Sequence, residues 1–155
     1  MTRLLLIAYG NPLRRDDGVG WLVAESLRPE FSDSTLTIIT SCQVLPEMVT
    51  AVSEAAYVFF VDAGMNLLPG DWHEEPLVPV LDATASSMTH HLTPGQLLAM
   101  SWILYGTAPT AWMITIGGAD FALGEGLSPA VQRACEAVCQ HLHGRITALT
   151  SVQIR

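Results

Sequence analysis

The sequence LLLIAY at Leu4–Tyr9 runs directly into GNPLRRDDGVG at Gly10–Gly20, and this junction decides the fold. A continuous apolar run of strand length predicts a β-strand that is buried on both faces of a sheet. Three glycines and two adjacent carboxylates, Asp16 and Asp17, follow without a spacer. In open α/β sheets, ligands bind beyond the carboxyl ends of the strands, so this loop is the first place to look for a functional site.

Three further apolar runs indicate buried strands, and helix-like patterns separate them. The strands are expected at Leu36–Thr40, Tyr57–Asp62 and Ala111–Ile116. The helices are expected at Val19–Leu27, Pro46–Ala55, Pro94–Tyr105 and Pro129–Leu142. Because helices alternate with continuously apolar strands, the sequence predicts an α/β fold in which helices cover both faces of a parallel sheet.

Local sequence signals define the start of two of these helices, whereas the secondary structure of one segment stays undecided. Thr93-Pro94 and Ser128-Pro129 each place a capping residue before a proline at the first helical position. The segment Leu67–Asp82 is rich in proline and acidic residues. It predicts either an edge strand around His73–Val80 or a loop.

Length and charge exclude several classes of function. The 155 residues fit one domain that spans residues 1–155. The net charge of −8 argues against nucleic acid and anionic membranes as partners. The absence of lysine excludes a Walker-type phosphate lysine and a Schiff-base lysine. Residues 83–119 carry no charged side chain, but Pro94, Gly106 and Pro109 interrupt them, so we expect no membrane span.

The cysteines indicate a reducing compartment. Cys42, Cys135 and Cys139 are an odd number without the spacing of a disulfide framework, and the first residues show no signal-peptide pattern. We therefore expect a cytoplasmic protein. Cys135 and Cys139 share one face of the last predicted helix, whereas His141 and His143 point elsewhere. This spacing favours packing over a zinc site.

Two acids form the first candidate site. Asp17 follows the first predicted strand, and Asp62 ends the third in FVDAG. If the strand order is 2-1-3, these strands are neighbours and the side chains just past their ends meet. Two like charges in one place then need a cation. Each acid also has a simpler interpretation, in which Asp17 caps a helix that starts near Gly18 and Asp62 stabilises a turn.

Two histidines form the second candidate group. His90 and His91 lie just before the helix start at Thr93. Two carboxylate oxygens and one imidazole nitrogen suit a borderline divalent ion such as nickel or zinc. Exposed or capping histidines are the simpler interpretation. A different site would pair Cys42 as a nucleophile with His91 as its base, although a buried, inert cysteine is the preferred interpretation.

Four motifs give the chain a resemblance to a known family. They are GNPLRRDDGVG after the first strand, VDAG at the end of the third, HHLTPGQLL at a helix start and GEGLSP before the last helix. With them the chain resembles, over nearly its whole length, the maturation endopeptidases of [NiFe] hydrogenases. The resemblance implies a three-layer α/β/α architecture with a twisted, mostly parallel sheet of about five strands.

The resemblance also implies an activity. Such endopeptidases remove the C-terminal extension of a hydrogenase large-subunit precursor after nickel has been inserted. Carried over, the residues that recognise the nickel are Asp17, Asp62 and His91. The resemblance also implies that the nickel arrives with the substrate and that the protein has no cofactor of its own. Asp17 or Asp62 is then a ligand or the general base. The residues expected to contact the substrate are Asn11, Gln43 and His90.

The chain departs from one well-known branch of the family at two places. Gly95 stands where that branch has its histidine, so His90 and His91 are alternative ligands. SCQVLPE around Gln43 stands where that branch has an Asp-Gly-Gly-Thr turn. This pattern is more similar to the branch that serves soluble NAD-linked hydrogenases.

The glycine loop has an expected role on this interpretation. Gly10 and Asn11 turn the chain sharply off the strand, and Gly18 and Gly20 keep side chains away from a docking peptide tail. Two other functions stay open. One is a chaperone that binds the large subunit without cleaving it, and the other is a cysteine hydrolase with Cys42 as the nucleophile and His91 as the base.

Overall fold

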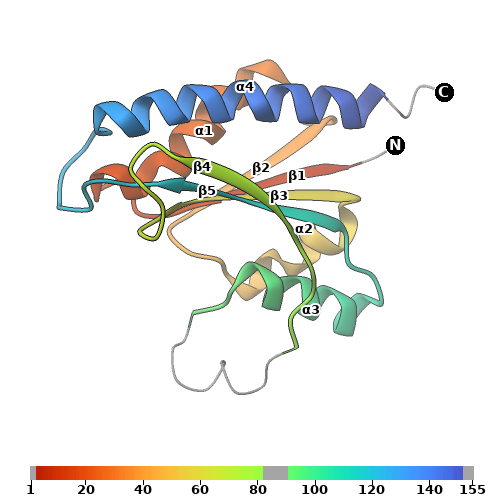
Figure 1. Cartoon of the computed structure of the whole chain (residues 1–155). Helices are drawn as coiled ribbons and strands as arrows, with labels where there is room; N and C mark the ends of the chain where they lie inside the picture. The colour runs from red at the N-terminus through yellow and green to blue at the C-terminus, as the bar shows by residue number, and fades with distance from the viewer. Residues whose placement is uncertain (1–2, 82–90, 152–155) are drawn as a thin grey trace.

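The structure is a computed structural model that describes residues 3–81 and 91–151, and its centre is a five-stranded sheet (Figure 1). The strands are β1 (Leu4–Tyr9), β2 (Leu36–Ser41), β3 (Tyr57–Gly64), β4 (Trp72–Leu77) and β5 (Thr110–Gly117). They lie in the order β2-β1-β3-β5-β4. β4 runs antiparallel to β5 at one edge, and the other neighbouring strands pair in parallel. The predicted 2-1-3 order and the mostly parallel sheet are confirmed.

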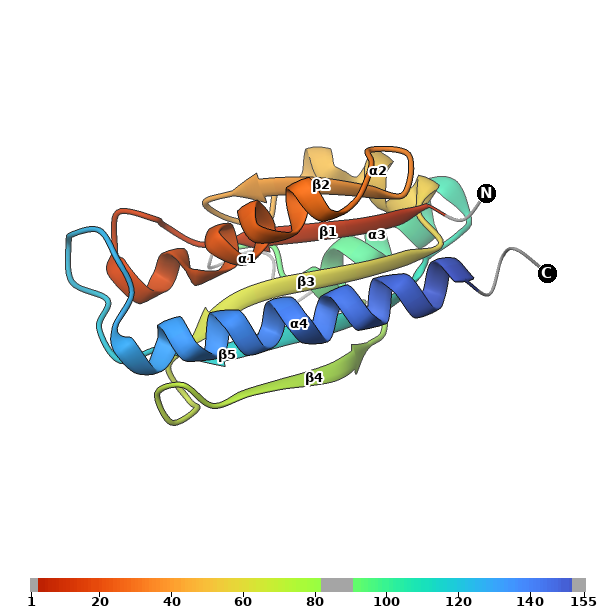
Figure 2. The same ribbon diagram turned by 90° about the horizontal axis from the view of Figure 1, so that it is seen from above.

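Helices cover both faces of this sheet and complete three layers. The helices are α1 (Val19–Leu27), α2 (Val49–Glu54), α3 (Pro94–Tyr105) and α4 (Pro129–Ser151). α1 and α4 lie side by side over one face, as Figure 2 shows from above, and α2 and α3 cover the other (Figure 1). In the described residues, no helix is both long enough and apolar enough to cross a membrane.

Alternation along β1 explains why its sequence is continuously apolar. Leu4, Leu6 and Ala8 pack under α1 and α4. Leu5 and Ile7 pack against the layer of α2 and α3. Since both faces of the central strands are covered, each strand residue has to be apolar until the strand reaches the edge of the sheet.

The observed helices refine the predicted ones. Short 3-10 helices lie at Arg15–Gly18, Arg28–Glu30 and Pro46–Met48. The predicted helix Pro46–Ala55 is therefore a 3-10 turn followed by α2, and α4 continues past Leu142 to Ser151. α3 has its predicted bounds because Thr93 and Gln96 form a capping box, in which each side chain accepts a hydrogen bond from the other residue's backbone N–H.

The segment Leu67–Asp82 contains an edge strand in the part that the structure describes. β4 pairs with β5 from Trp72 to Leu77. Its one proline, Pro76, is tolerated because an edge strand has one side without strand partners. The chain then returns past the start of α3, where the N–H of Val80 donates to the carbonyl of Gly95 at 2.9 Å.

Candidate functional site

Asp17 and Asp62 meet at the carboxyl edge of the two central parallel strands. β1 and β3 pair with Ala8 opposite Val61, so Asp62 lies beside the end of β1. Asp17 lies in the 3-10 turn that follows β1. Burial first, and the charge of Asp17 second, raise the pKa of Asp62 to about 7. The structure thus brings the two predicted acids together, and a proton or a cation has to offset their repulsion.

The loop after β1 holds the Asp17 carboxylate in place. Its Oδ2 accepts a hydrogen bond from the backbone N–H of Asn11 at 2.8 Å. The side-chain oxygen of Asn11 accepts one from the N–H of Leu13 at 2.9 Å. The N-cap of α1 is Gly18, and no side chain caps that helix. The simpler interpretation of Asp17 as a helix cap is therefore wrong, because its carboxylate is turned back toward the strand end.

Among the residues that the structure describes, Asp62 is hydrogen-bonded to its neighbour in the chain. Its Oδ1 accepts from the N–H of the next residue, Ala63, at 2.8 Å. This bond favours the ionised carboxylate, but burial and the neighbouring Asp17 outweigh it. Because both residues belong to β3, the bond lies within the strand rather than in a turn beyond it. Asp62 therefore remains a half-buried carboxyl group with an unusually high pKa.

Tyr9 belongs to this site and was missed by sequence reasoning. It ends β1 on the face covered by α2 and α3, and its hydroxyl donates to the sulfur of Met113 at 3.9 Å. Burial, and then the charge of Asp62, raise the pKa of Tyr9 above its usual range, so the phenol stays protonated. The available signal was the alternation of side chains along the strands, since Tyr9 at the end of β1 is level with Asp62 on the parallel strand β3 and both lie on the same face.

The other acid of the loop, Asp16, ties two loops together. It is fully buried. Its Oδ2 accepts from the N–H groups of Ala119 and Asp120 at 2.8 and 2.9 Å, and both of its oxygens accept from Ser128, from the N–H and from the hydroxyl, each at 2.8 Å. Burial opposes ionisation, but these bonds outweigh it and lower the pKa of Asp16. The hydroxyl of Ser128 was expected to cap the last helix, but it donates its hydrogen bond to this carboxylate.

The glycines of the loop are required by close backbone packing. Gly10 has a φ of +137°, and a side chain there would collide with the backbone carbonyl of Asp17. A Cβ on Gly18 would lie 2.7 Å from Cα of Pro12, and one on Gly20 would lie 2.9 Å from the carbonyl oxygen of Val61. The expectation that Gly18 and Gly20 leave room for a docking tail is therefore wrong, since both face the protein's own backbone.

In the part of the chain that the structure describes, no third ligand lies with the two acids. His91 is exposed and lies just before α3. His90 lies outside the described residues. Within residues 3–81 and 91–151, no group of three or more histidine, cysteine or acidic side chains is arranged to hold a metal ion. The ligand roles of Asp17, Asp62 and His91 stay predictions.

The loop after β2 places Gln43 and Cys42 at the surface. Both are exposed, and the N–H of Gln43 donates to the hydroxyl of Ser41 at 3.4 Å. β2 is the neighbour of β1, so this loop leaves the sheet at the same edge as the loop that carries Asp17. Cys42 is exposed rather than buried, and the structure, which describes both residues, shows no hydrogen bond between it and His91. The geometry gives the cysteine-hydrolase interpretation no support.

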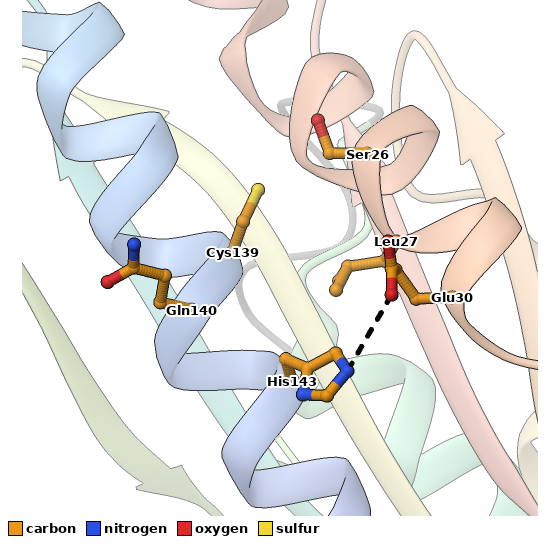
Figure 3. A pocket seen from close by; sticks show the side chains of 6 residues that line it. All are labelled: Ser26, Leu27, Glu30, Cys139, Gln140 and His143. Atoms are coloured by element: carbon orange, nitrogen blue, oxygen red, sulfur yellow. Dashed lines mark ion pairs between the residues drawn. The ribbon is translucent and has the colours of Figure 1, made fainter.

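Cys135 and His141 of α4 diverge as predicted, but the prediction is wrong for His143, which lines the same surface pocket as Cys139, one helical turn earlier. Cys135 is buried in the core, whereas His141 contacts Glu74 on β4 at 2.9 Å. His143 lies on another side of the helix than His141, 3.8 Å from Glu30 (Figure 3). In the described part of the chain these side chains form no metal site.

Comparison with solved structures identifies close matches to this fold. A [NiFe] hydrogenase maturation protease, HycI of Thermococcus kodakarensis, is 23% identical with a TM-score of 0.74, covering 94% of this chain and 93% of that one. The hydrogenase maturating endopeptidase HybD of E. coli is 18% identical with a TM-score of 0.74, covering 99% and 94%. A hydrogenase 2 maturation peptidase from a Thaumarchaeota archaeon is 20% identical with a TM-score of 0.68, covering 94% and 99%.

These matches establish a shared fold over nearly the whole chain. No protein-family model matches the sequence. No curated protein matches it either. The predicted three-layer architecture is confirmed by the sheet and by these structural neighbours, many of which are hydrogenase maturation endopeptidases.

Proposed function

We propose that this protein is a cytoplasmic endopeptidase that removes the C-terminal extension of a [NiFe]-hydrogenase large-subunit precursor after nickel insertion. One observation carries the proposal. Asp17 and Asp62 converge at the carboxyl edge of β1 and β3, within a fold shared with maturation endopeptidases. That edge is where ligands bind in open α/β sheets.

The chemistry of the two acids supports a substrate that brings a divalent cation. Asp17 and the half-buried Asp62 repel each other, so a cation bound by Asp17 would offset this repulsion. Carboxylate oxygens together with the imidazole of His91 or His90 form a mixed O/N set that suits nickel. In this proposal the nickel belongs to the precursor, and its presence marks a precursor that is ready for cleavage.

The second role of the acidic pair is proton transfer. Cleavage of a peptide bond needs a group that takes a proton from the attacking water and returns one to the leaving amine. A general base works best when its pKa is near the working pH, and the pKa of Asp62 is about 7. We assign Asp62 the role of base and Asp17 that of ligand. The hydroxyl of Tyr9 lies near Asp62 and stays protonated, so it adds no second negative charge beside the Asp62 carboxylate.

Substrate contacts are assigned to the loops around the acids. The backbone and side chain of Asn11 are engaged within the loop, so its contribution is to shape the site around Asp17. The exposed Gln43, on the loop after β2, offers a side-chain amide that can bind an extended peptide. His90 is the third residue that we assign to substrate contact.

The test is a cleavage assay that is read by intact mass. Precursor loaded with nickel is incubated with the protein, beside the same precursor without nickel. We expect loss of the C-terminal extension from the loaded precursor alone. Equal cleavage of both forms would exclude nickel as the recognition signal. Unchanged mass together with stable binding would identify a chaperone instead.

A matched variant separates the acidic site from a cysteine mechanism. Cys42→Ala removes the exposed thiol without touching Asp17 or Asp62. We expect this variant to cleave the loaded precursor at the wild-type rate. Loss of cleavage in Cys42→Ala would show that the thiol is a nucleophile, since an exposed residue of this size has little structural role.

A further inference from the structure

The strand β2 lies at one margin of the sheet, beside β1. In the described residues no strand pairs with its other side, as Figure 2 shows from above. The carbonyl of Ser41 points toward β1, because it accepts a hydrogen bond at 3.1 Å from the N–H of Gly10, which follows β1. Since the backbone groups of alternate strand residues point to opposite sides, those of Ile38 and Thr40 point to the open margin.

The turn before β2 engages only the first of the outward backbone groups. The N–H of Leu36 donates to the carbonyl of Ser32 at 3.0 Å. Within residues 3–81 and 91–151, no turn or loop backbone forms a hydrogen bond with Ile38 or Thr40. Their N–H and carbonyl groups form a row of donors and acceptors at the spacing of an extended chain.

The two margins of the sheet differ in their protection against a further strand. β4, at the other margin, carries Glu74, Glu75 and Pro76. Charged residues and proline are the devices by which natural sheets prevent another chain from adding to an edge. β2 has the sequence LTIITS, without charge, proline or glycine, and its isoleucines and threonines favour strand pairing. The β2 edge is therefore suited to accept a strand, and the β4 edge is not.

The side chains of β2 define the chemistry of the strand that fits there. Ile38 is partly buried against the core under α1 and α4, and Ile39 against the core under α2 and α3. An added strand places its side chains alternately beside one and the other. A segment that is apolar on both faces covers both isoleucines, and the net charge of −8 disfavours an acidic one.

We propose that the open edge of β2 binds an extended, apolar segment of the precursor's C-terminal extension as an additional strand. This inference rests on the proposed function, which brings that extension to the molecule. Main-chain hydrogen bonds to Ile38 and Thr40 hold the segment, and contact with Ile38 and Ile39 selects its apolar side chains.

The β2 edge is continuous with the site of the two acids. The strand leads into the loop of Gln43, and the end of β2 is joined to the glycine loop by the hydrogen bond between Ser41 and Gly10. β1 alone separates β2 from β3, which carries Asp62, so the two strands lie about 10 Å apart. About three extended residues span this distance. A peptide held along β2 therefore reaches the acids within a few residues.

Hydrogen exchange on a bound complex tests the edge directly. Asp62→Asn lacks the proposed base but keeps Asp17, so it should bind nickel-loaded precursor without cleaving it. We expect the amides of Ile38 and Thr40 to exchange at least about tenfold more slowly in this complex than in the free variant. The amides of Ile39 and Ser41 should change little, because they already point to β1. The processed large subunit, which lacks the extension, should leave all four rates unchanged.

A pair of substitutions at Thr40 tests the same contact through kinetics. Thr40→Pro removes an outward N–H and no bond to β1, whereas Thr40→Val keeps the N–H and matches threonine in shape. We expect Thr40→Pro to raise KM for the loaded precursor about tenfold, with kcat unchanged, from the loss of one or two hydrogen bonds. Thr40→Val should behave as wild type. A thermal melt checks that both variants are folded, and the exchange experiment does not depend on them.

The outcomes separate this inference from the proposed function. Cleavage by wild type without slower exchange at Ile38 and Thr40 overturns the β2 site alone. Slower exchange without cleavage upholds the β2 site and contradicts the peptidase. Protection by the processed subunit overturns the extension as the occupant. Protection in the free protein that is lost on dilution also overturns it, since a second copy of the chain then occupies the edge.

Discussion

Asp62 on β3 lies beside Asp17, which follows the neighbouring parallel strand β1, and the pKa of Asp62 is raised to about 7, mainly by burial and then by the charge of Asp17. Near neutral pH the pair therefore holds one negative charge more readily than two. A divalent cation bound by Asp17 beside this carboxyl group competes with the proton on Asp62, so cation binding should strengthen as the pH rises through 7.

We expect Asp62 to make the protein less stable as the pH rises from about 4 to about 7. The unfolded chain releases this proton near pH 4, whereas the folded chain keeps it until about pH 7. Below pH 4 both states are protonated and the group has no effect, and above pH 7 the loss is complete, at most about 4 kcal/mol. Urea unfolding of Asp62→Asn and wild type at pH 5 and pH 8 measures it. An equal difference in stability at both pH values would contradict the raised pKa.

Replacing Asp17 with asparagine should abolish cleavage and leave the fold intact. The amide oxygen still accepts the hydrogen bond from the N–H of Asn11, but the ligand charge is lost. We expect a fall in the cleavage rate of roughly 100-fold or more, with a melting temperature near that of wild type. The intact-mass assay and a thermal melt provide the two readouts. Wild-type cleavage by Asp17→Asn would exclude the ligand role.

Replacing the adjacent Asp16 should mainly destabilise the protein, whereas replacing Asp17 should mainly abolish cleavage. Asparagine would place an NH₂ group where a carboxylate oxygen now accepts hydrogen bonds from Ala119, Asp120 or Ser128. We expect Asp16→Asn to lower the free energy of unfolding by about 2–3 kcal/mol, because at least one buried donor loses its acceptor. The urea midpoint measures this, and a wild-type midpoint would show that the buried contacts contribute little.

The contrast between Asp16 and Asp17 shows which features of the site can be predicted from the sequence and which cannot. The continuous apolar runs and the aspartates after them predicted four of the five strands and the edge where the site lies, on the assumption of a 2-1-3 strand order that the structure confirms. They could not predict which of Asp16 and Asp17 turns inward, because that depends on Ala119, 103 residues later in the chain. The position of His91 relative to the acids likewise depends on how the chain returns from β4 to α3, which no local pattern determines.

The backbone of the glycine loop offers a further test with a matched control. Gly10→Ala would place a methyl group against the carbonyl of Asp17 at a φ of +137°, so we expect a loss of about 3 kcal/mol or more and displacement of Asp17. Gly126→Ala also introduces a side chain at positive φ, +92°, but nothing lies within 4 Å of the added Cβ. The control should lose only about 1–2 kcal/mol, from backbone conformation alone. Urea unfolding of both variants gives the comparison, and equal losses would mean that the contact between Gly10 and Asp17 does not constrain the loop.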